Sequence, residues 1–220
     1  MGQNSKARRD KKKKLKKDAT ASSIRQLPSD PSRIESEIAK LFSPSLLTTP
    51  AEINTDIEKF CRRISNEKPI FIEITPELWS RQSCCDSNTE EYIKIHGGKV
   101  ICGYKIWYHP PNYIEGERHA VWYNDGVFRD ITFNSDGEKR ILFIPDVPSK
   151  QQSLELNEHR IRWAKDSYTR ELVKLVEKAE RMRPVYKMSK EEAWESMLTY
   201  ESWLEGHRMS TVREKPIGQY

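Results

Sequence analysis

The sequence predicts an α+β fold, in which a cysteine-bearing helix packs on an antiparallel sheet of about four or five strands, with N-terminal helices and two C-terminal helices. Three observations favour this class. Residues 100–144 contain several β-type runs with turn signals between them. The flanking segments repeat their apolar residues at helical spacing. The pair Asp125-Gly126 separates two β-type runs and is typical of a tight hairpin, which favours antiparallel strands.

Length and composition limit the class of protein. The chain has 220 residues, 32% charged and 36% hydrophobic, which suits one domain with appendages. No apolar run approaches the ~18 residues that cross a bilayer, and the polybasic start lacks the apolar stretch of a secretory signal. We therefore expect a soluble, cytoplasmic protein. We divide it into a disordered basic arm (1–31), an α+β core (32–150) and a helical extension (151–220).

Two helices and a strand are expected before the cysteine-bearing helix. A short helix covers residues 32–42. A second helix begins at a capping box between Thr49 and Glu52 and continues to about Ile64. The apolar run 69–74 predicts a strand.

The cysteine-bearing helix is capped by Asp86, Ser87 or Asn88 and ends at Gly97-Gly98. An antiparallel meander follows, with strands over 100–108, 113–123, 127–133 and 140–144. A long amphipathic helix then covers about 155–181, and a second begins at a capping box between Ser189 and Glu192. These last two helices either pack on the core or recruit a protein partner.

A candidate site begins at the hairpin, whose two strands carry His119 and Asp130. A two-residue loop at Asp125-Gly126 places His119 diagonally from Asp130 on the same face. A four-residue loop places the two side chains directly opposite each other, and a three-residue loop puts them on opposite faces. The interpretation of the site therefore depends on the turn.

An imidazole beside a carboxylate is the orienting half of a nucleophilic triad. The missing nucleophile is supplied upstream by Cys85 or by its competitor Cys84. A cysteine at a helix N-terminus is favoured as thiolate. His119 takes and returns the proton, and Asp130 fixes the imidazole. The four cysteines lack disulfide or zinc-finger spacing, and we expect reduced thiols. Cys61 and Cys102 are expected in the core.

A cysteine that opens a helix, followed by His-Ala-Val-Trp on one strand and Asp-Ile-Thr on the next, resembles the core of papain-like and transglutaminase-like folds. The motifs Cys-x-x-Asn, His-Gly-Gly, Gly-Tyr-x-Ile-Trp, Glu-x-x-His-Ala-Val-Trp and Asp-Ile-Thr resemble more closely a small bacterial domain of unassigned activity. The resemblance covers about residues 69–146 and implies a Cys-His-Asp site. It favours Cys85 over Cys84, because Cys85 has the matching spacing to Asn88. Asp-Ile-Thr lacks the proline of the larger families, and no upstream segment obviously supplies the oxyanion-hole side chain.

Three residues are assigned to substrate binding: Gln82, Asn88 and Trp122. Gln82 or a backbone N–H near Cys85 can stabilise an oxyanion. Trp122 belongs to a set of aromatic residues at period two, a pattern more typical of packed sheet faces than of a stacking platform for nucleic acid. The expected function is a thiol hydrolase or acyltransferase acting on an amide or ester. No cofactor is expected, and no metal, although Glu115 and Glu117 lie near His119.

The alternative is a non-catalytic binding protein whose basic arm engages RNA, the ribosome or another polyanion. The net charge is +5, yet the chain outside residues 6–17 contains 29 basic and 32 acidic residues and is negative. An anionic membrane surface also fits the arm, and so does a simple solubilising role. The nine candidate polyanion-binding residues are Lys6, Arg8, Arg9, Lys11, Lys12, Lys13, Lys14, Lys16 and Lys17.

Overall fold

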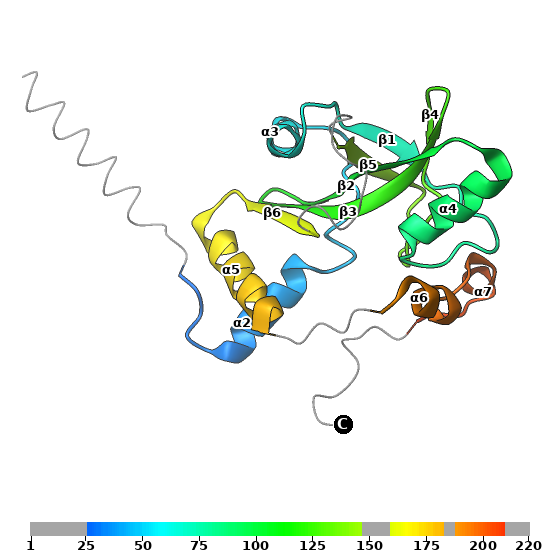
Figure 1. Ribbon diagram of the computed structural model, residues 1–220. Coiled ribbons are helices and arrows are strands. Elements are labelled where there is room, and N and C mark those ends of the chain that lie inside the picture. The colour runs from blue at the N-terminus through cyan, green and yellow to red at the C-terminus, as the bar shows by residue number, and fades with distance from the viewer. Residues whose placement is uncertain (1–25, 147–158, 183–187, 210–220) are drawn as a thin grey trace, which may run out of the picture.

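The computed structural model describes residues 26–146, 159–182 and 188–209 (Figure 1). These ranges contain six helices and a six-stranded antiparallel sheet, so the predicted α+β class is confirmed. Most of the expected arm, residues 1–25, lies outside them, and so does the expected boundary at residue 150. No helix within these ranges has the length and apolar character needed to span a membrane.

Two helices precede the sheet. Helix α2 spans Pro31–Leu41 and is capped by Asp30. Helix α3 spans Thr55–Ile64, so the expected start near Thr49 is wrong. The Asn54 side chain accepts the N–H groups of residues 56 and 57 and caps this helix. Thr49 instead donates its N–H and its hydroxyl to the Glu138 carboxylate, at 2.7 and 2.8 Å, a contact 89 residues away that no local pattern contains.

The strands are β1 (Ile70–Glu73), β2 (Lys99–His109), β3 (Tyr113–Asn124), β4 (Val127–Arg129), β5 (Arg140–Pro145) and β6 (Arg160–Ala164). Their order is β1-β5-β2-β3-β4, and β6 pairs with β3. The sheet is therefore not the expected simple meander, because β5 returns to lie between β1 and β2. It also has six strands, where four or five were expected.

Strands β1 and β4, which lie at the two ends of the order β1-β5-β2-β3-β4, come together at Asp130. The Asp130 N–H donates to the Glu73 carbonyl at 3.1 Å, and the Thr75 N–H donates to the Asp130 carbonyl at 2.8 Å. A parallel bridge between Ile74 and Asp130 joins the same segments. The sheet thus curls on itself, and the chain just after β4 is fixed in place by the end of β1.

The core has apolar side chains on both faces of the central strands. On one face, α3 packs Ile57 and Phe60 against Ile106 and Leu142. Because side chains alternate along a strand, the neighbouring Phe143 faces the other way and joins a second cluster with Ile72, Val121 and Ile141. Burial of these side chains from water is the main force that holds the sheet in its curled form.

Helix α4 spans Cys85–His96 and packs against β3 and β2. Tyr92 contacts the Trp122 ring at 5.3 Å between centroids, nearly edge to face. The helix ends, as predicted, at Gly97, which has a φ of 68° that favours glycine. The apolar contacts in its middle leave its N-terminal turn beside the sheet residues of the candidate site.

The C-terminal part differs most from expectation. The single helix expected over 155–181 is wrong, because Arg160–Ala164 forms β6 and only Ser167–Met182 is helical, as α5. Residues 155–158 lie outside the described ranges. The expected second helix is two short ones, α6 (Lys190–Ser196) and α7 (Tyr200–Leu204), and α6 begins with the predicted capping box. The extension therefore adds a strand to the core sheet.

Ion pairs explain why Arg160 and Arg162 belong to a strand. Arg160 and Arg162 contact the buried Glu115 carboxylate at 3.1 and 3.0 Å. Arg162 also pairs with Glu180 of α5 at 2.7 Å. A buried carboxylate needs such partners, so the side chains at 160 and 162, two residues apart, must point the same way. Strand geometry provides this spacing and helix geometry does not.

Candidate active site

The β3–β4 hairpin brings His119 and Asp130 together. Tyr123 pairs with Phe128, as the two-residue loop requires. Asp125 and Gly126 have φ angles of 46° and 87°, as in a type I′ turn. The predicted register is therefore confirmed, and His119 Nε2 lies 3.0 Å from Asp130 Oδ2. The two side chains lie on the same face, on the diagonal expected for this turn.

Asp130 is fully buried and its carboxylate is bonded at both oxygens. Oδ2 faces the imidazole, and Oδ1 accepts the Thr132 N–H at 2.9 Å. With its backbone fixed by β1, this side chain can hold the His119 ring in one orientation. The ring nitrogen Nε2 is occupied by Asp130.

Cys85 lines the same pocket as His119, and its sulfur is close enough to raise the pKa of the imidazole. Cys85 is the first residue of α4, one position before the predicted caps, and Cys84 occupies the N-cap position. The N-cap residue Cys84 makes no side-chain cap bond, and the Asp86 carboxylate accepts the Ser87 N–H at 2.9 Å, so the N–H groups of Cys85 and Asp86 are the first-turn donors that can face the sulfur. These groups and the helix dipole stabilise negative charge on the sulfur.

The charges around His119 favour its protonated form. Burial lowers its pKa, but the Asp130 carboxylate and the Cys85 sulfur outweigh burial and raise the pKa to about 10. An imidazolium between a carboxylate and a thiolate is the charge arrangement of an activated cysteine. Cys85 and His119 thus share one pocket, and Asp130 holds the His119 ring from behind.

Burial shifts the pKa values of the three cysteines other than Cys85. Burial raises the pKa of Cys61 to about 12, and it raises those of Cys84 and Cys102 to about 11. All four are free thiols. Cys84 is buried and does not line the pocket described next. Of the two adjacent candidates, Cys85 is therefore the one that the fold brings to His119.

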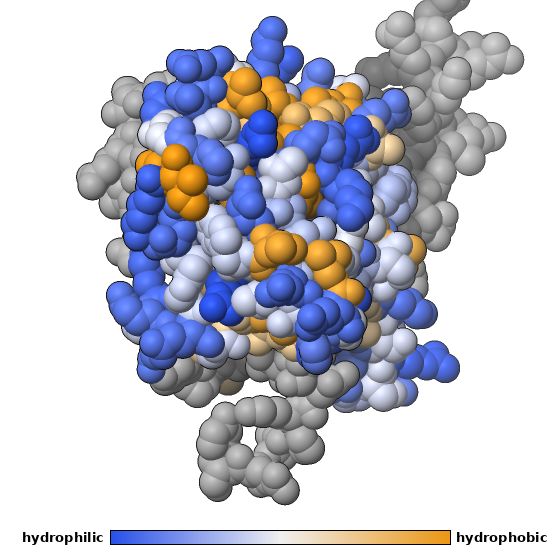
Figure 2. Space-filling view, turned by 90° about the vertical axis from the view of Figure 1, so that its right-hand side faces the viewer, coloured by the Kyte–Doolittle hydropathy of each residue, from blue (hydrophilic) through white to orange (hydrophobic). Residues whose placement is uncertain are grey.

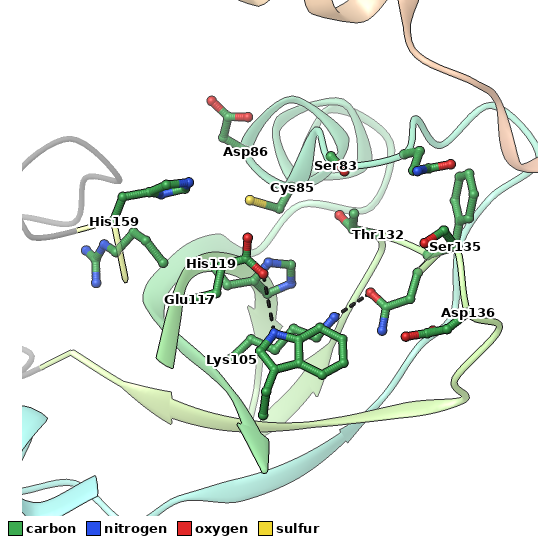
Figure 3. A pocket seen from close by; sticks show the side chains of 15 residues that line it. Ser83, Cys85, Asp86, Lys105, Glu117, His119, Thr132, Ser135, Asp136 and His159 are labelled. Atoms are coloured by element: carbon green, nitrogen blue, oxygen red, sulfur yellow. Dashed lines mark hydrogen bonds between the residues drawn. The ribbon is translucent and has the colours of Figure 1, made fainter. Parts of the chain in front are cut away.

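Cys85 and His119 open into a pocket of about 360 Å³ (Figure 3). Figure 3 shows the Cys85 sulfur above the His119 ring, with the Glu117 carboxylate nearby and the Lys105 side chain running below. A cavity of this volume accommodates a small ligand or one end of a larger one. Its other walls include Gln82, Ser83, Trp107, Thr132, Phe133, Asn134, Asp136 and His159.

The three residues assigned to substrate binding have different positions. Gln82 lines the pocket. Asn88 is fully buried behind it, where its amide bonds the N–H and carbonyl of Arg81 at 2.7 Å each and the Thr132 hydroxyl at 3.0 Å. Trp122 does not line the pocket, and its indole N–H donates to the Gly97 carbonyl at 2.8 Å. Asn88 and Trp122 therefore support the site from outside the pocket.

Sequence reasoning did not identify Lys105, Trp107 or Asn134. Lys105 is almost fully buried, donates to Asn134 and lies 3.9 Å above the centre of the Trp107 ring. The sequence did contain one indication of this site. Lys105 interrupts the β-type run 100–108 and, by the period of two, lies on the same face as Trp107. Asn134 follows the hairpin by several residues, so no local pattern connects it with Lys105.

Helices α6 and α7 hold the loop that leads into Cys85. The Gln82 N–H donates to the Leu198 carbonyl at 2.9 Å, and the Tyr200 N–H donates to the Ser80 carbonyl at 2.8 Å. Arg81 also lies over the Trp194 ring, 5.4 Å from its centre. Helices α6 and α7 therefore contact the core at this loop, which is one of the two alternatives expected for the C-terminal helices. Recruitment of a protein partner by them stays a prediction.

Within the described ranges, no group of three or more His, Cys, Asp and Glu side chains is arranged to hold a metal ion. Glu115 accepts from the Tyr113 hydroxyl and from Arg160 and Arg162. Glu117 accepts from Trp107 and Arg160. These carboxylates thus stabilise β3 and its contacts with β6.

Comparisons with protein-family models, with curated proteins and with solved structures found no match for this chain.

Proposed function

We propose that the chain is a thiol hydrolase or acyltransferase that acts on an amide or ester through Cys85, His119 and Asp130. One observation carries the proposal. Cys85 and His119 line one open pocket, the Cys85 sulfur is close enough to raise the pKa of His119, and Nε2 of the His119 ring lies 3.0 Å from Asp130. A cysteine that only packs in the core needs neither a neighbouring histidine nor an aspartate that holds it. The resemblance to papain-like and transglutaminase-like cores supports the same assignment.

In the first half of the reaction, the Cys85 thiolate attacks the carbonyl carbon of the substrate and the carbonyl oxygen becomes an oxyanion. The Cys85 N–H at the start of α4 and the Gln82 side chain are the candidate donors to this oxygen. His119 then gives its proton to the leaving amine or alcohol. The carbon–nitrogen or carbon–oxygen bond breaks, and the acyl group remains on Cys85 as a thioester.

In the second half, neutral His119 removes a proton from an incoming nucleophile, which attacks the thioester. The Cys85 thiolate leaves and the imidazolium is restored. Water as nucleophile gives a hydrolase, and an amine or alcohol gives an acyltransferase. We propose the cytoplasm as the location, because the chemistry needs reduced thiols and all four cysteines are free.

The test is the reactivity of the nucleophile. Iodoacetamide should alkylate Cys85 well before Cys61, Cys84 and Cys102, whose pKa values are raised by burial. With p-nitrophenyl acetate as an ester probe, the acetyl group should be found on Cys85 by mass spectrometry. Cys85→Ser should abolish this adduct, and the adjacent Cys84→Ser is the matched control that should retain it.

His119→Ala should move the pH profile of Cys85 alkylation upward, because it removes the cation beside the thiolate. His159→Ala, which changes another pocket-lining histidine, is the control. If Cys85 reacts no faster than the other cysteines and His119→Ala leaves its profile unchanged, the catalytic proposal is wrong.

The second candidate function is polyanion binding, favoured by nine lysines and arginines within residues 6–17. These residues lie outside the described ranges, so the proposal of a polyanion-binding arm is based on the sequence alone. Deletion of residues 1–20 should weaken binding of the full chain to a single-stranded RNA, and the remaining affinity should depend less steeply on salt. Unchanged affinity and salt dependence after the deletion would contradict an RNA-binding arm.

A further inference from the structure

A buried lysine lies in the pocket beside the candidate triad and has no part in the proposed reaction. Lys105 lies on β2, opposite Glu117 of β3, and its side chain is directed into the pocket below His119 (Figure 3). Only 3% of the residue is exposed. A buried lysine without a counter-charge in contact with it either loses its proton or pairs with a bound anion.

The direct contacts of the Lys105 ammonium involve no negative charge. Nζ donates to the neutral Asn134 amide oxygen and faces the Trp107 ring. Among the described residues, no carboxylate oxygen is paired with this nitrogen within ion-pair distance. An ammonium group has three N–H donors. Asn134 uses one of them, which leaves donor capacity at the pocket surface.

The carboxylates whose charges act on Lys105 are bonded to other groups. Burial lowers the pKa of Lys105, and four carboxylates partly oppose this effect. Asp130 holds His119 and Glu117 pairs with Arg160 at 3.0 Å. The other two are fixed by Thr49 and by a backbone N–H: Glu138 and Asp136. None of the four makes a direct bond to the lysine among the described residues.

We propose that Lys105 binds an anionic group of the acyl substrate, so that the substrate is an amide or ester whose acyl chain ends in a carboxylate. This inference rests on the function proposed above and specifies its substrate class. The carboxylate accepts from Lys105 Nζ while the scissile carbonyl lies at Cys85. Asn134 holds the ammonium group in place, and the Trp107 ring forms the adjoining wall. The bound anion supplies the counter-charge that the protein itself does not place there.

The experiment compares two reagents of opposite charge on the full chain at pH 7: 2-sulfonatoethyl and 2-aminoethyl methanethiosulfonate. The Cys85 sulfur attacks the sulfenyl sulfur, a disulfide to the ethyl group forms, and methanesulfinate leaves. The sulfonate stands in for the substrate carboxylate. Each rate at Cys85, followed by peptide mapping, is divided by the rate of the same reagent with a free thiol in solution.

The anionic reagent should be favoured in the unaltered chain. Lys105→Met, which keeps a similar length without the charge, should lower the anion-to-cation rate ratio by about tenfold. Lys99→Met changes an exposed lysine on the same strand and should leave the ratio unchanged. Iodoacetamide is neutral, so its rate at Cys85 should change little in Lys105→Met.

A preference of the unaltered chain for the cationic reagent would overturn the inference, and that comparison needs no substituted protein. So would an unchanged ratio in Lys105→Met while Cys85 still reacts rapidly with iodoacetamide. In both cases the thiol is active and the proposed function survives. A Cys85 that is unreactive toward all three reagents would instead overturn the proposed function, and this inference with it.

Discussion

His119 illustrates how neighbouring charges override burial at a single residue. Burial alone disfavours an imidazolium, yet the carboxylate 3.0 Å away and the sulfur on the other side raise the pKa of His119 to about 10. The protonated ring is therefore the resting form at neutral pH. It can stabilise a thiolate before reaction and donate a proton to the leaving group during it.

Replacement of Asp130 by Asn should lower the pKa of His119, because it removes a charge that raises it and nearly preserves side-chain shape. A neighbouring opposite charge shifts a pKa by about one to three pH units, so a fall of this size is expected. Titration of the His119 imidazole by NMR measures it directly. Asp125→Asn, at the turn of the same hairpin, is the matched control and should change nothing. An unaltered His119 titration in Asp130→Asn would contradict the assigned pair.

The sequence could predict those parts of the site that local chemistry determines. Asp125-Gly126 is a turn signal by itself, and it fixes the register that joins His119 to Asp130. Lys105 differs, because its environment combines β2, β3 and the chain after β4. Asn134, its hydrogen-bond partner, is 29 residues away. The environment of Lys105 therefore forms only when these distant segments come together in the folded sheet.

The same distinction holds for the elements. The capping box of α6 was predictable because Ser189 and Glu192 bond each other within one turn. The start of α3 was not, because Glu138 holds Thr49 from a distant segment. Strand β6 was missed for a similar reason, since its arginines fit an amphipathic helix until the buried Glu115 is known.

Two glycines allow a test of whether the close approach of β2 and β5 limits the stability of the sheet. A Cβ at Gly103 would lie 2.2 Å from the Ile144 carbonyl oxygen, whereas a Cβ at Gly126 meets nothing within 4 Å. Gly103→Ala should therefore separate β2 from β5 next to His119 and lower the free energy of unfolding by roughly 3 kcal/mol, at the upper end of the overpacking range. Gly126→Ala should cost about 1 kcal/mol, from its positive φ alone.

Urea denaturation measures both values. The Cys85 alkylation rate should fall in Gly103→Ala, because β5 is displaced beside the strand position that faces His119. Gly126→Ala should lower the Cys85 alkylation rate less. Equal destabilisation by the two substitutions would show that the close approach of β2 and β5 does not limit stability.

At the scale of the molecule, the two ends of the described chain cover different parts of one sheet. Helices α2 and α5 pack together beside β6, and α6 and α7 lie below α4 (Figure 1). The side that carries α4, α6 and α7 is mainly hydrophilic, with hydrophobic residues in separate groups (Figure 2). Scattered exposed residues of this kind are ordinary on soluble proteins. The contacts of α6 and α7 with the loop before Cys85 are therefore the better guide to what these helices do.

The contacts of α6 and α7 with this loop are of two kinds, exposed ion pairs and less exposed backbone and ring contacts. Their contributions to the free energy decide which kind holds the loop. Lys190 bridges Asp86 and Glu90 at 3.0 and 2.9 Å, but its side chain is 55% exposed. Exposed ion pairs contribute only about 0–1 kcal/mol. The backbone bond from Gln82 to Leu198 and the tilted ring contacts of Phe133 with Tyr200 and Trp203 are less exposed to solvent screening. We therefore assign the positioning of the Cys85 loop to the second kind.

Deletion of residues 188–220 should release this loop while the sheet stays folded, because all six strands of the described residues precede the deleted segment. The Gln82 amide loses its acceptor, Leu198, so its hydrogen exchange should accelerate strongly, and the Cys85 alkylation rate should change with it. Lys190→Ala is the matched control and should leave both nearly unaltered. Hydrogen-exchange mass spectrometry over residues 78–84 gives the comparison. If Gln82 keeps its protection after the deletion, the loop is held by α4 and the sheet alone, and the C-terminal helices do not position the candidate nucleophile.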